Sequence, residues 1–265
     1  MRISVIMPIH NEEEYLPYSL RQLDELKGKI HEFIFIIDNC KDKSERIIQK
    51  FALKHPNCKI FYVKEHKWLN KPVENYDFGA QHATGNYIYF IDADTIVDPK
   101  IFKKEIWKKG NALRFRYYNY NLYGSKIPYA YEKVLLKIAG RLGFAKGQCF
   151  VLAFRRNYWR KIRFEAPPED IEGFLKCPKI VLKHILEQTD KKIYKYITDT
   201  ECLHLRPKLT KGQQLLQGVA RLLLKYPFWK VLLHSILRFK IYILIGYLQA
   251  KNGNYGNLKS LRFNQ

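Results

Sequence analysis

Four short apolar segments alternate with three segments of helical length over the first ninety or so residues, and this alternation limits the possible folds more than any other feature. The apolar segments are rich in β-branched and aromatic residues, as in strands buried on both faces of a sheet: Ile3–Ile9, Glu32–Asp38, Lys59–Val63 and Tyr87–Asp92. The intervening segments have helical period: Glu12–Lys27, Asp42–Lys54 and Val73–Thr84. The pattern predicts an α/β fold whose mostly parallel, Rossmann-like sheet is flanked by helices.

The remainder of the first two hundred residues is less regular. We expect strands at Ala112–Gly124, Gln148–Phe154 and Lys192–Ile197. Helices are expected at Tyr129–Leu142 and near Pro178–Gln188, with a loop at Ala166–Asp170.

Polar side chains follow three of the apolar segments of the first half. They are Asn11, Asp38 and the pair Asp92 and Asp94. In open α/β sheets, ligands bind beyond the carboxyl ends of the parallel strands. The sequence therefore predicts one acidic ligand-binding edge.

The stretch IDADT carries two acids whose spacing calls for an explanation. Capping explains the later Asp98, because Pro99 favours the first helical turn directly after a cap. Asp92 and Asp94, two residues apart at the end of an extended segment, can point to one side and would repel each other. A divalent cation removes this conflict, and Mg²⁺ or Mn²⁺ commonly binds one or two carboxylates together with substrate phosphates. The alternative is a purely structural acid pair.

The formal net charge of +22 favours an anionic partner: a nucleic acid, a phosphorylated small molecule or an acidic membrane surface. The cysteines are odd in number and lack a C-x-x-C pair, which is typical of reduced thiols in a cytosolic protein. They are Cys40, Cys58, Cys149, Cys177 and Cys202. The N-terminal segment, broken by Pro8, predicts neither a signal peptide nor an anchor.

Six motifs in order resemble family 2 glycosyltransferases of the GT-A fold, which are inverting and use nucleotide-sugars. They are VIMPIHNEE from Val5, the strand-ending Asp38, Lys71 with Gly79, the Asp-x-Asp pair Asp92 and Asp94, Glu169-Asp170, and His204. The family's usual Asp-Gly-Ser-x-Asp is here DNCKD from Asp38. No Gln-x-x-Arg-Trp motif is present, which argues against a processive polysaccharide synthase.

The resemblance implies a catalytic domain over residues 1–206, with a nucleotide-sugar-binding half at 1–95 and an acceptor-side half at 96–206. It implies donor contacts at Pro8, Asn11, Glu13, Asp38, Lys71, Asp92, Asp94 and Glu169, with Asp38 at the nucleotide base. Asp94 would bind the metal directly, Asp92 the ribose or the metal through water, and His204 the metal or diphosphate. A hydrogen-bonded structural role is the alternative for His204.

Inversion needs a base opposite the leaving group, and the resemblance assigns this role to Asp170. The alternative is that Glu169 and Asp170 cap the helix after Pro167-Pro168. A lipid phosphate acceptor, already ionised at neutral pH, would need no base.

From about Lys208 the character changes, and residues 207–265 are predicted to form a basic amphipathic helical extension. Lys230, His234 and Arg238 recur in one stripe against leucines and isoleucines, with Trp229 nearby. Such helices suit peripheral membrane contact through 213–250, on the cytoplasmic face of the membrane, near lipid-linked or cell-surface glycan acceptors. The alternative is that the apolar faces pack on the catalytic domain or on a second subunit. The longest uncharged run, Ile241–Ala250, is too short to predict a transmembrane helix.

A second class of function is a nucleotidyltransferase or nucleic-acid-binding protein. The segment RFRYYNYNLYG (Arg114–Gly124) interleaves basic and aromatic residues as stacking platforms for single strands do. The glycosyltransferase interpretation is preferred, so no nucleic acid partner is expected. The sequence leaves the sugar, the nucleotide base (UDP- or GDP-linked), the acceptor and the oligomeric state open.

Overall fold

The computed structural model describes residues 1–66, 71–120, 122–123, 126–127, 129–131, 133–135, 148–162, 195–205, 214–215, 218–219, 221–222, 226–237 and 241–253. Contacts within the chain divide it into two units. The first comprises Met1–Val181 and Gln188–Pro207 and contains all the described strands, and the second comprises Leu182–Glu187 and Lys208–Gln265 and contains the last two described helices. The domain boundary predicted at 206/207 and the subdivision at residue 95 both remain predictions.

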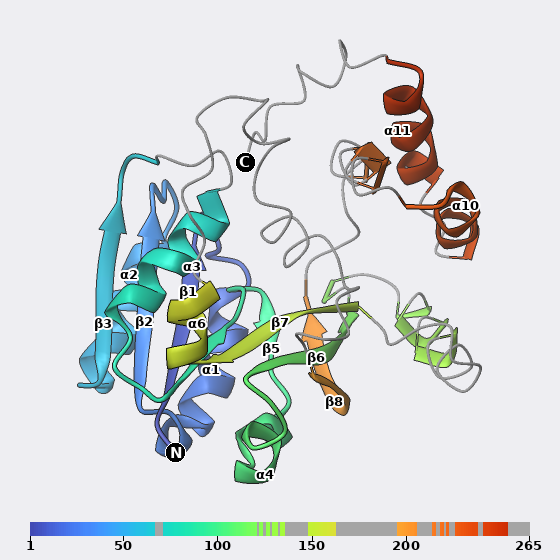
Figure 1. Ribbon diagram of the computed structural model, residues 1–265. Helices are drawn as coiled ribbons and strands as arrows, with labels where there is room; N and C mark the ends of the chain where they lie inside the picture. The colour runs from blue at the N-terminus through green and yellow to red at the C-terminus, as the bar shows by residue number, and fades with distance from the viewer. Residues whose placement is uncertain are drawn as a thin grey trace. The chain divides into compact units, whose positions relative to one another are not determined.

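The first unit is built on one eight-stranded mixed sheet (Figure 1). Its strands, in sheet order, are β3 (Cys58–Val63), β2 (Glu32–Asp38), β1 (Ile3–Ile9), β4 (Tyr87–Phe90), β7 (Gln148–Arg155), β6 (Ala112–Asn119), β8 (Lys195–His204) and β5 (Thr95–Ile96). The first four are mutually parallel, whereas β7 is antiparallel to both neighbours and β5 is antiparallel to β8. The predicted parallel arrangement is therefore confirmed for β1 to β4, the strands of the first ninety residues.

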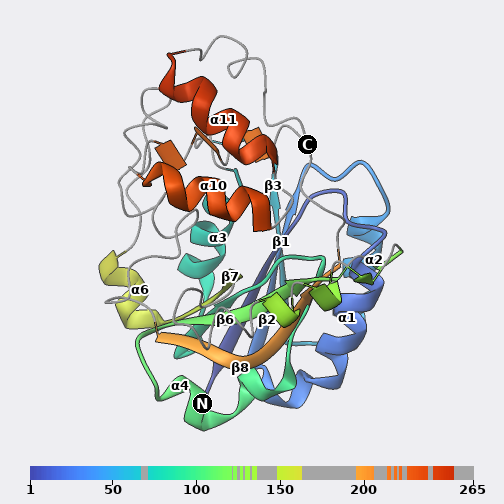
Figure 2. The same cartoon turned by 90° about the vertical axis from the view of Figure 1, so that its right-hand side faces the viewer.

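Helices cover both faces of this sheet (Figure 2). They are α1 (Leu16–Glu25), α2 (Ser44–Lys54), α3 (Lys71–His82), α4 (Lys104–Trp107) and α6 (Arg156–Ile162), with 3-10 turns η1 (Lys27–Lys29) and η2 (Pro99–Phe102). Alternate residues of β1 and β2, such as Val5 and Phe35, share a buried cluster with α1 and α2. The residues between them, such as Ile6 and Ile36, contact α3. Burial on both faces explains why these strands read as continuous apolar runs.

Gly79 sets how closely α3 approaches the sheet. A Cβ atom there would lie 2.5 Å from Ile6 Cγ2 and 2.9 Å from Ile36 Cδ1, closer than carbon atoms pack. Only a residue without a side chain fits at this crossing. This close crossing lies in the C-terminal half of α3, and Asn75, one turn earlier in the helix, reaches Asp38 at the carboxyl end of β2.

The second unit contains α10 (Phe228–Leu237) and α11 (Ile241–Lys251). Val231 of α10 and Ile243 and Tyr247 of α11 form its small buried cluster. Within the described residues, no helix is long and apolar enough to cross a bilayer.

Candidate active site

Asp94 and His204 meet at the carboxyl edge of the sheet. The Nε2 atom of His204 lies 3.2 Å from Oδ2 of Asp94. Strand pairing places them together, because Thr95 of β5 is directly opposite His204 of β8 and the Leu205 amide donates to the Asp94 carbonyl at 2.8 Å. The Asp94 side chain is buried, while that of His204 is about one quarter exposed. Solvent or a ligand can therefore reach this pair from the side of His204.

Asp92 lies in a different environment from Asp94. It is exposed, and its Oδ1 accepts a 2.6 Å hydrogen bond from the hydroxyl of Tyr76 on α3. Burial raises the pKa of Tyr76 well above its ordinary value, and the negative charges of Asp92 and Asp94 raise it further. The Tyr76 hydroxyl thus stays protonated, and by donating this hydrogen bond it orients the Asp92 carboxylate.

The expectation that both acids end an extended segment is wrong. Strand β4 stops at Phe90, and a turn follows in which the Thr95 amide donates to the Asp92 carbonyl at 3.1 Å. Gln22 of α1 then holds the chain by bonding both backbone groups of Val97, with 2.7 Å from the Val97 amide to Oε1. The turn, rather than strand alternation, gives one acid a buried and the other an exposed position.

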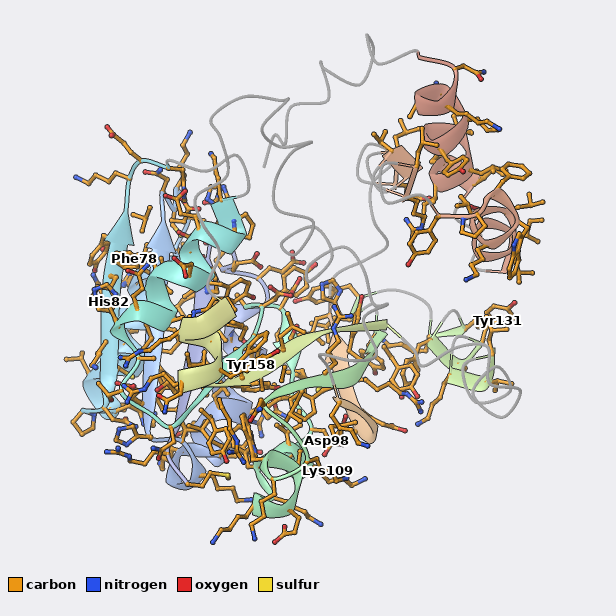
Figure 3. All side chains as sticks on the ribbon, in the orientation of Figure 1. Phe78, His82, Asp98, Lys109, Tyr131 and Tyr158 are labelled. Atoms are coloured by element: carbon orange, nitrogen blue, oxygen red, sulfur yellow. The ribbon has the colours of Figure 1, made fainter. Side chains whose placement is uncertain are left out.

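Asp98, labelled in Figure 3, is confirmed as a capping residue. Its Oδ1 accepts from the Lys100 amide at 2.8 Å at the start of η2. Its Oδ2 accepts from the Glu201 amide of β8 at 2.8 Å, a contact that the sequence did not predict. Asp98 therefore also fixes β8, the strand that ends at His204.

Asp38 ends β2 in a buried polar cluster. Its Oδ1 accepts from Nε2 of His66 at 2.9 Å and its Oδ2 from Nδ2 of Asn75 at 3.0 Å. The other ring nitrogen of His66 lies 3.2 Å from Oε2 of Glu74. Among the described residues, each Asp38 oxygen has one hydrogen-bond partner, and a carboxylate oxygen can accept two hydrogen bonds. The carboxylate is fixed in position and keeps acceptor capacity for a ligand.

The loops after β1 and β2 are tied to each other. Oδ2 of Asp42 accepts from the Glu13 amide, and Oε2 of Glu13 accepts from the Lys43 amide, both at 2.9 Å. Oδ1 of Asn11 accepts from the Lys41 amide at 2.7 Å. A pocket beside these loops is lined by Asn11, Glu13, Glu14, Tyr15, Asp42, Lys43, Arg46, Ile47 and Lys50. Two predicted donor-binding residues, Asn11 and Glu13, therefore share one pocket.

The loop that departs from the family pattern contains a left-handed residue. Asn39, in place of the usual glycine, has φ of 45°, and asparagine adopts this region more readily than most residues. Its side chain donates to the Lys64 carbonyl at 2.6 Å. The substituted loop thus keeps a tight turn after Asp38.

The other predicted site residues stand apart from these contacts. Pro8 lies within β1 opposite Ile36, and Lys71 is exposed at the first position of α3. Glu169 and Asp170 lie outside the described residues. Sequence reasoning missed His66, Asn75 and Tyr76, since none belongs to a recognised motif and their contacts depend on how α3 crosses the strand ends.

A divalent cation fits this donor set if a bound molecule supplies further ligands. Carboxylate oxygen and imidazole nitrogen, as in Asp94 and His204, are both ligands that Mn²⁺ accepts. In the part of the chain that the structure describes, no three His, Cys, Asp or Glu side chains form a metal-holding group. An ion here would need substrate oxygens, as Mg²⁺ ions bound with phosphates do. The arrangement fits an ion shared with a substrate.

The aromatic segment Arg114–Gly124 is not a stacking surface over its strand residues. Phe115, Tyr117 and Tyr118 of β6 are buried in the sheet's core, and Arg114 is only 1% exposed. Bases stack on accessible rings. The alternative interpretation of this segment as a single-strand platform is therefore wrong for β6.

Comparison with known proteins gives a family match over about half of the chain. The model of glycosyl transferase family 2 matches residues 4–133. An uncharacterized glycosyltransferase of Haemophilus influenzae is 28% identical over 189 residues, which cover 69% of this chain and 74% of that protein. The bactoprenol glucosyl transferase of Shigella phage SfX is 34% identical over 118 residues, 42% of this chain and 37% of that one. The chain spans 11% to 32% of the length of other curated relatives that it matches.

Among solved structures, the chain resembles the mannosyltransferase PcManGT from Pyrobaculum calidifontis in complex with GDP-Man and Mn²⁺. The TM-score is 0.53 at 17% identity, over 98% of this chain and 72% of that one. Similarity at this level of identity concerns the fold.

Proposed function

The chain belongs to glycosyl transferase family 2 through residues 4–133, and we propose that it moves a sugar from a nucleoside-diphosphate sugar to an acceptor with inversion at the anomeric carbon. The observation that carries this proposal is the contact between His204 and Asp94, beside Asp92, at the carboxyl edge of the sheet. These residues would hold Mg²⁺ or Mn²⁺ together with the donor's diphosphate. The Mn²⁺ in the PcManGT complex supports this choice of ion.

The donor would lie along the strand ends, with its base at Asp38 and its ribose at Asp92. Asp38 supports this role because His66 and Asn75 hold its carboxylate with acceptor capacity to spare. The remaining donor contacts would come from the loop after β1, through Pro8, Asn11 and Glu13, and from Lys71 and Glu169. The donor would be a UDP- or GDP-sugar, so its base would be uracil or guanine.

Catalysis would rest on stabilising the diphosphate as it leaves. Negative charge grows on the diphosphate as the glycosidic bond breaks, so a bound cation favours the transition state more than the ground state. Asp94, with His204, would fix where that positive charge is held. Asp170 would take the proton from the acceptor hydroxyl on the opposite face of the sugar.

The acceptor would be a lipid-linked or cell-surface glycan precursor. The bactoprenol glucosyl transferase of phage SfX, by its name, transfers glucose to the lipid bactoprenol. This name supports a reaction near a membrane, and we propose that the reaction takes place at the cytoplasmic face. If the acceptor group is a phosphate, Asp170 would not be needed as a base, because the phosphate is already ionised.

A screen of UDP- and GDP-sugars for hydrolysis, with Mn²⁺ or with a chelator, tests the proposal. We expect Mn²⁺-dependent, saturable hydrolysis of at least one donor. Pyrophosphate release from a nucleoside triphosphate, with no nucleotide-sugar consumed, would instead indicate a nucleotidyltransferase.

A further inference from the structure

The second unit has an unusual charge. Residues 208–265 contain ten lysines and arginines and no aspartate or glutamate. The rest of the chain mixes both signs, so residues 208–265 are the most uniformly positive part of the protein. A surface of one sign attracts an extended anionic partner.

The interior of this unit fixes which side of α10 faces inward. Val231 and Ser235, one turn apart, are buried at 0% and 1% exposure. They lie on the side that contributes to the cluster with Ile243 and Tyr247 of α11. Tyr247 also donates from its hydroxyl to the Tyr226 carbonyl at 3.0 Å, just before α10 begins.

A close crossing holds α11 against the segment that contains Leu215 and Gly218. A Cβ atom on Gly246 would lie 2.1 Å from the Leu215 carbonyl oxygen, and one on Gly218 would lie 2.1 Å from the Ile243 carbonyl oxygen. Two glycines at one crossing let the backbones touch, which leaves little freedom for the helices to turn. The side of α10 opposite the buried Val231 and Ser235 is its outward side.

That outward side is apolar. Trp229, Leu233 and Ile236 follow one another at steps of four and three residues, so they form one stripe. Their exposed fractions are 58%, 49% and 57%, on the side opposite Val231. The exposed Lys230 lies beside them, with Nζ 5.4 Å from the Trp229 ring centre. An amphipathic helix that packs against its own protein buries its apolar residues, whereas α10 exposes this apolar stripe to solvent beside the positive charge of Lys230.

We infer that this stripe, Trp229–Leu233–Ile236, inserts into the surface of an anionic lipid bilayer. Tryptophan prefers the boundary between headgroups and acyl chains, and leucine and isoleucine bury favourably just below it. The lysines and arginines of residues 208–265, with no acids among them to repel anionic headgroups, complement phosphatidylglycerol-type charge. Nucleic acid would use the charge but leave the aliphatic side chains without a partner. The inference depends on this unit alone and not on the proposed reaction.

Flotation of the full chain with vesicles tests the inference. The probes are phosphatidylcholine vesicles with and without about 30% phosphatidylglycerol. The test variant is Trp229→Ser/Leu233→Ser/Ile236→Ser, and Leu53→Ser, an 88% exposed leucine on α2, is the matched control. We expect the wild type and the control to float with anionic vesicles, and the test variant to float at least about tenfold less while remaining folded by circular dichroism.

Equal flotation of the test variant and wild type would overturn the inference, as would equal binding to neutral and anionic vesicles. If the test variant changes only the oligomeric state in gel filtration, or only the binding of an oligonucleotide, the stripe is a protein or nucleic acid contact and the inference fails. Nucleotide-sugar hydrolysis without vesicles should be the same in all three proteins.

Discussion

His204 Nε2 lies 3.2 Å from Asp94 Oδ2, which joins the last residue of β8 to the acid that follows β4. The antiparallel pairing of β5 with β8 produces this contact, so the second half of the first unit completes a site begun by the first half. A carboxylate and an imidazole that are far apart in the sequence can thus hold one ligand between them.

His204→Ala should weaken Mn²⁺-dependent donor binding by at least about tenfold, as expected when a metal contact or its immediate support is lost. Isothermal titration at several Mn²⁺ concentrations measures this change. His82→Ala, an exposed histidine of α3, is the control and should bind normally. Lower thermal stability with unchanged Mn²⁺ dependence would show that His204 has only a structural role.

Asp170→Asn should lower kcat by about 10² to 10⁴ with little change in donor binding, the range for loss of a general base. Steady-state transfer to a hydroxyl acceptor measures this effect. Glu169→Gln, the adjacent acid, is the comparison and should retain far more turnover. Near-normal turnover in Asp170→Asn with a hydroxyl acceptor would remove Asp170 from the mechanism.

His66→Ala should raise the donor KM about ten- to a hundredfold with a smaller effect on kcat. The variant removes a hydrogen bond to the charged Asp38 carboxylate, and such bonds contribute about 1.5–3 kcal/mol. His66→Gln can still donate from a nitrogen at similar reach and should restore most of the affinity. If both variants lose stability equally and KM stays constant, His66 does not position Asp38 for the donor.

Glu32, at the edge opposite the site, should make the fold acid-sensitive. Burial would raise its pKa, but hydrogen bonds from Lys59, Ser4 and Thr84 outweigh burial and lower the pKa to about 2. Because this folded-state pKa is below the unfolded value, the stabilisation is full above about pH 4.5 and is lost as pH falls toward 2. It amounts to at most about 3 kcal/mol.

Urea unfolding between pH 2 and 6 measures this effect. Glu32→Gln should be less stable than wild type at pH 6 and should change less with pH. Glu25→Gln, an exposed acid of α1, should follow the wild-type curve. Parallel curves for Glu32→Gln and wild type would contradict the assignment.

The first half of the fold could be predicted from the sequence because its strands are buried on both faces and its helices have clear periods. β1 and β2 begin and end at the predicted residues. The two-residue β5 could not be predicted, since a strand this short has no periodicity and exists only through its pairing with β8. The family resemblance read from the motifs is confirmed by the family match over residues 4–133.

The site was predictable in its residue types and less so in its geometry. Spacing alone suggested that Asp92 and Asp94 point to one side, whereas the turn after β4 separates them into an exposed and a buried acid. His66 escaped prediction because its contact with Asp38 joins the loop after β3 to the end of the neighbouring strand β2. The roles assigned to Asp38, Asp92, Asp94, Asp170 and His204 remain predictions.

The most direct test of the account is the binding of UDP and GDP to wild type and Asp94→Asn by isothermal titration, with and without Mn²⁺. We predict that wild type binds one of the two nucleotides much more tightly with Mn²⁺, and that Asp94→Asn loses this Mn²⁺ dependence while remaining folded. Binding that Mn²⁺ strengthens equally in both proteins would contradict the claim that Asp94 holds the ion and the diphosphate together.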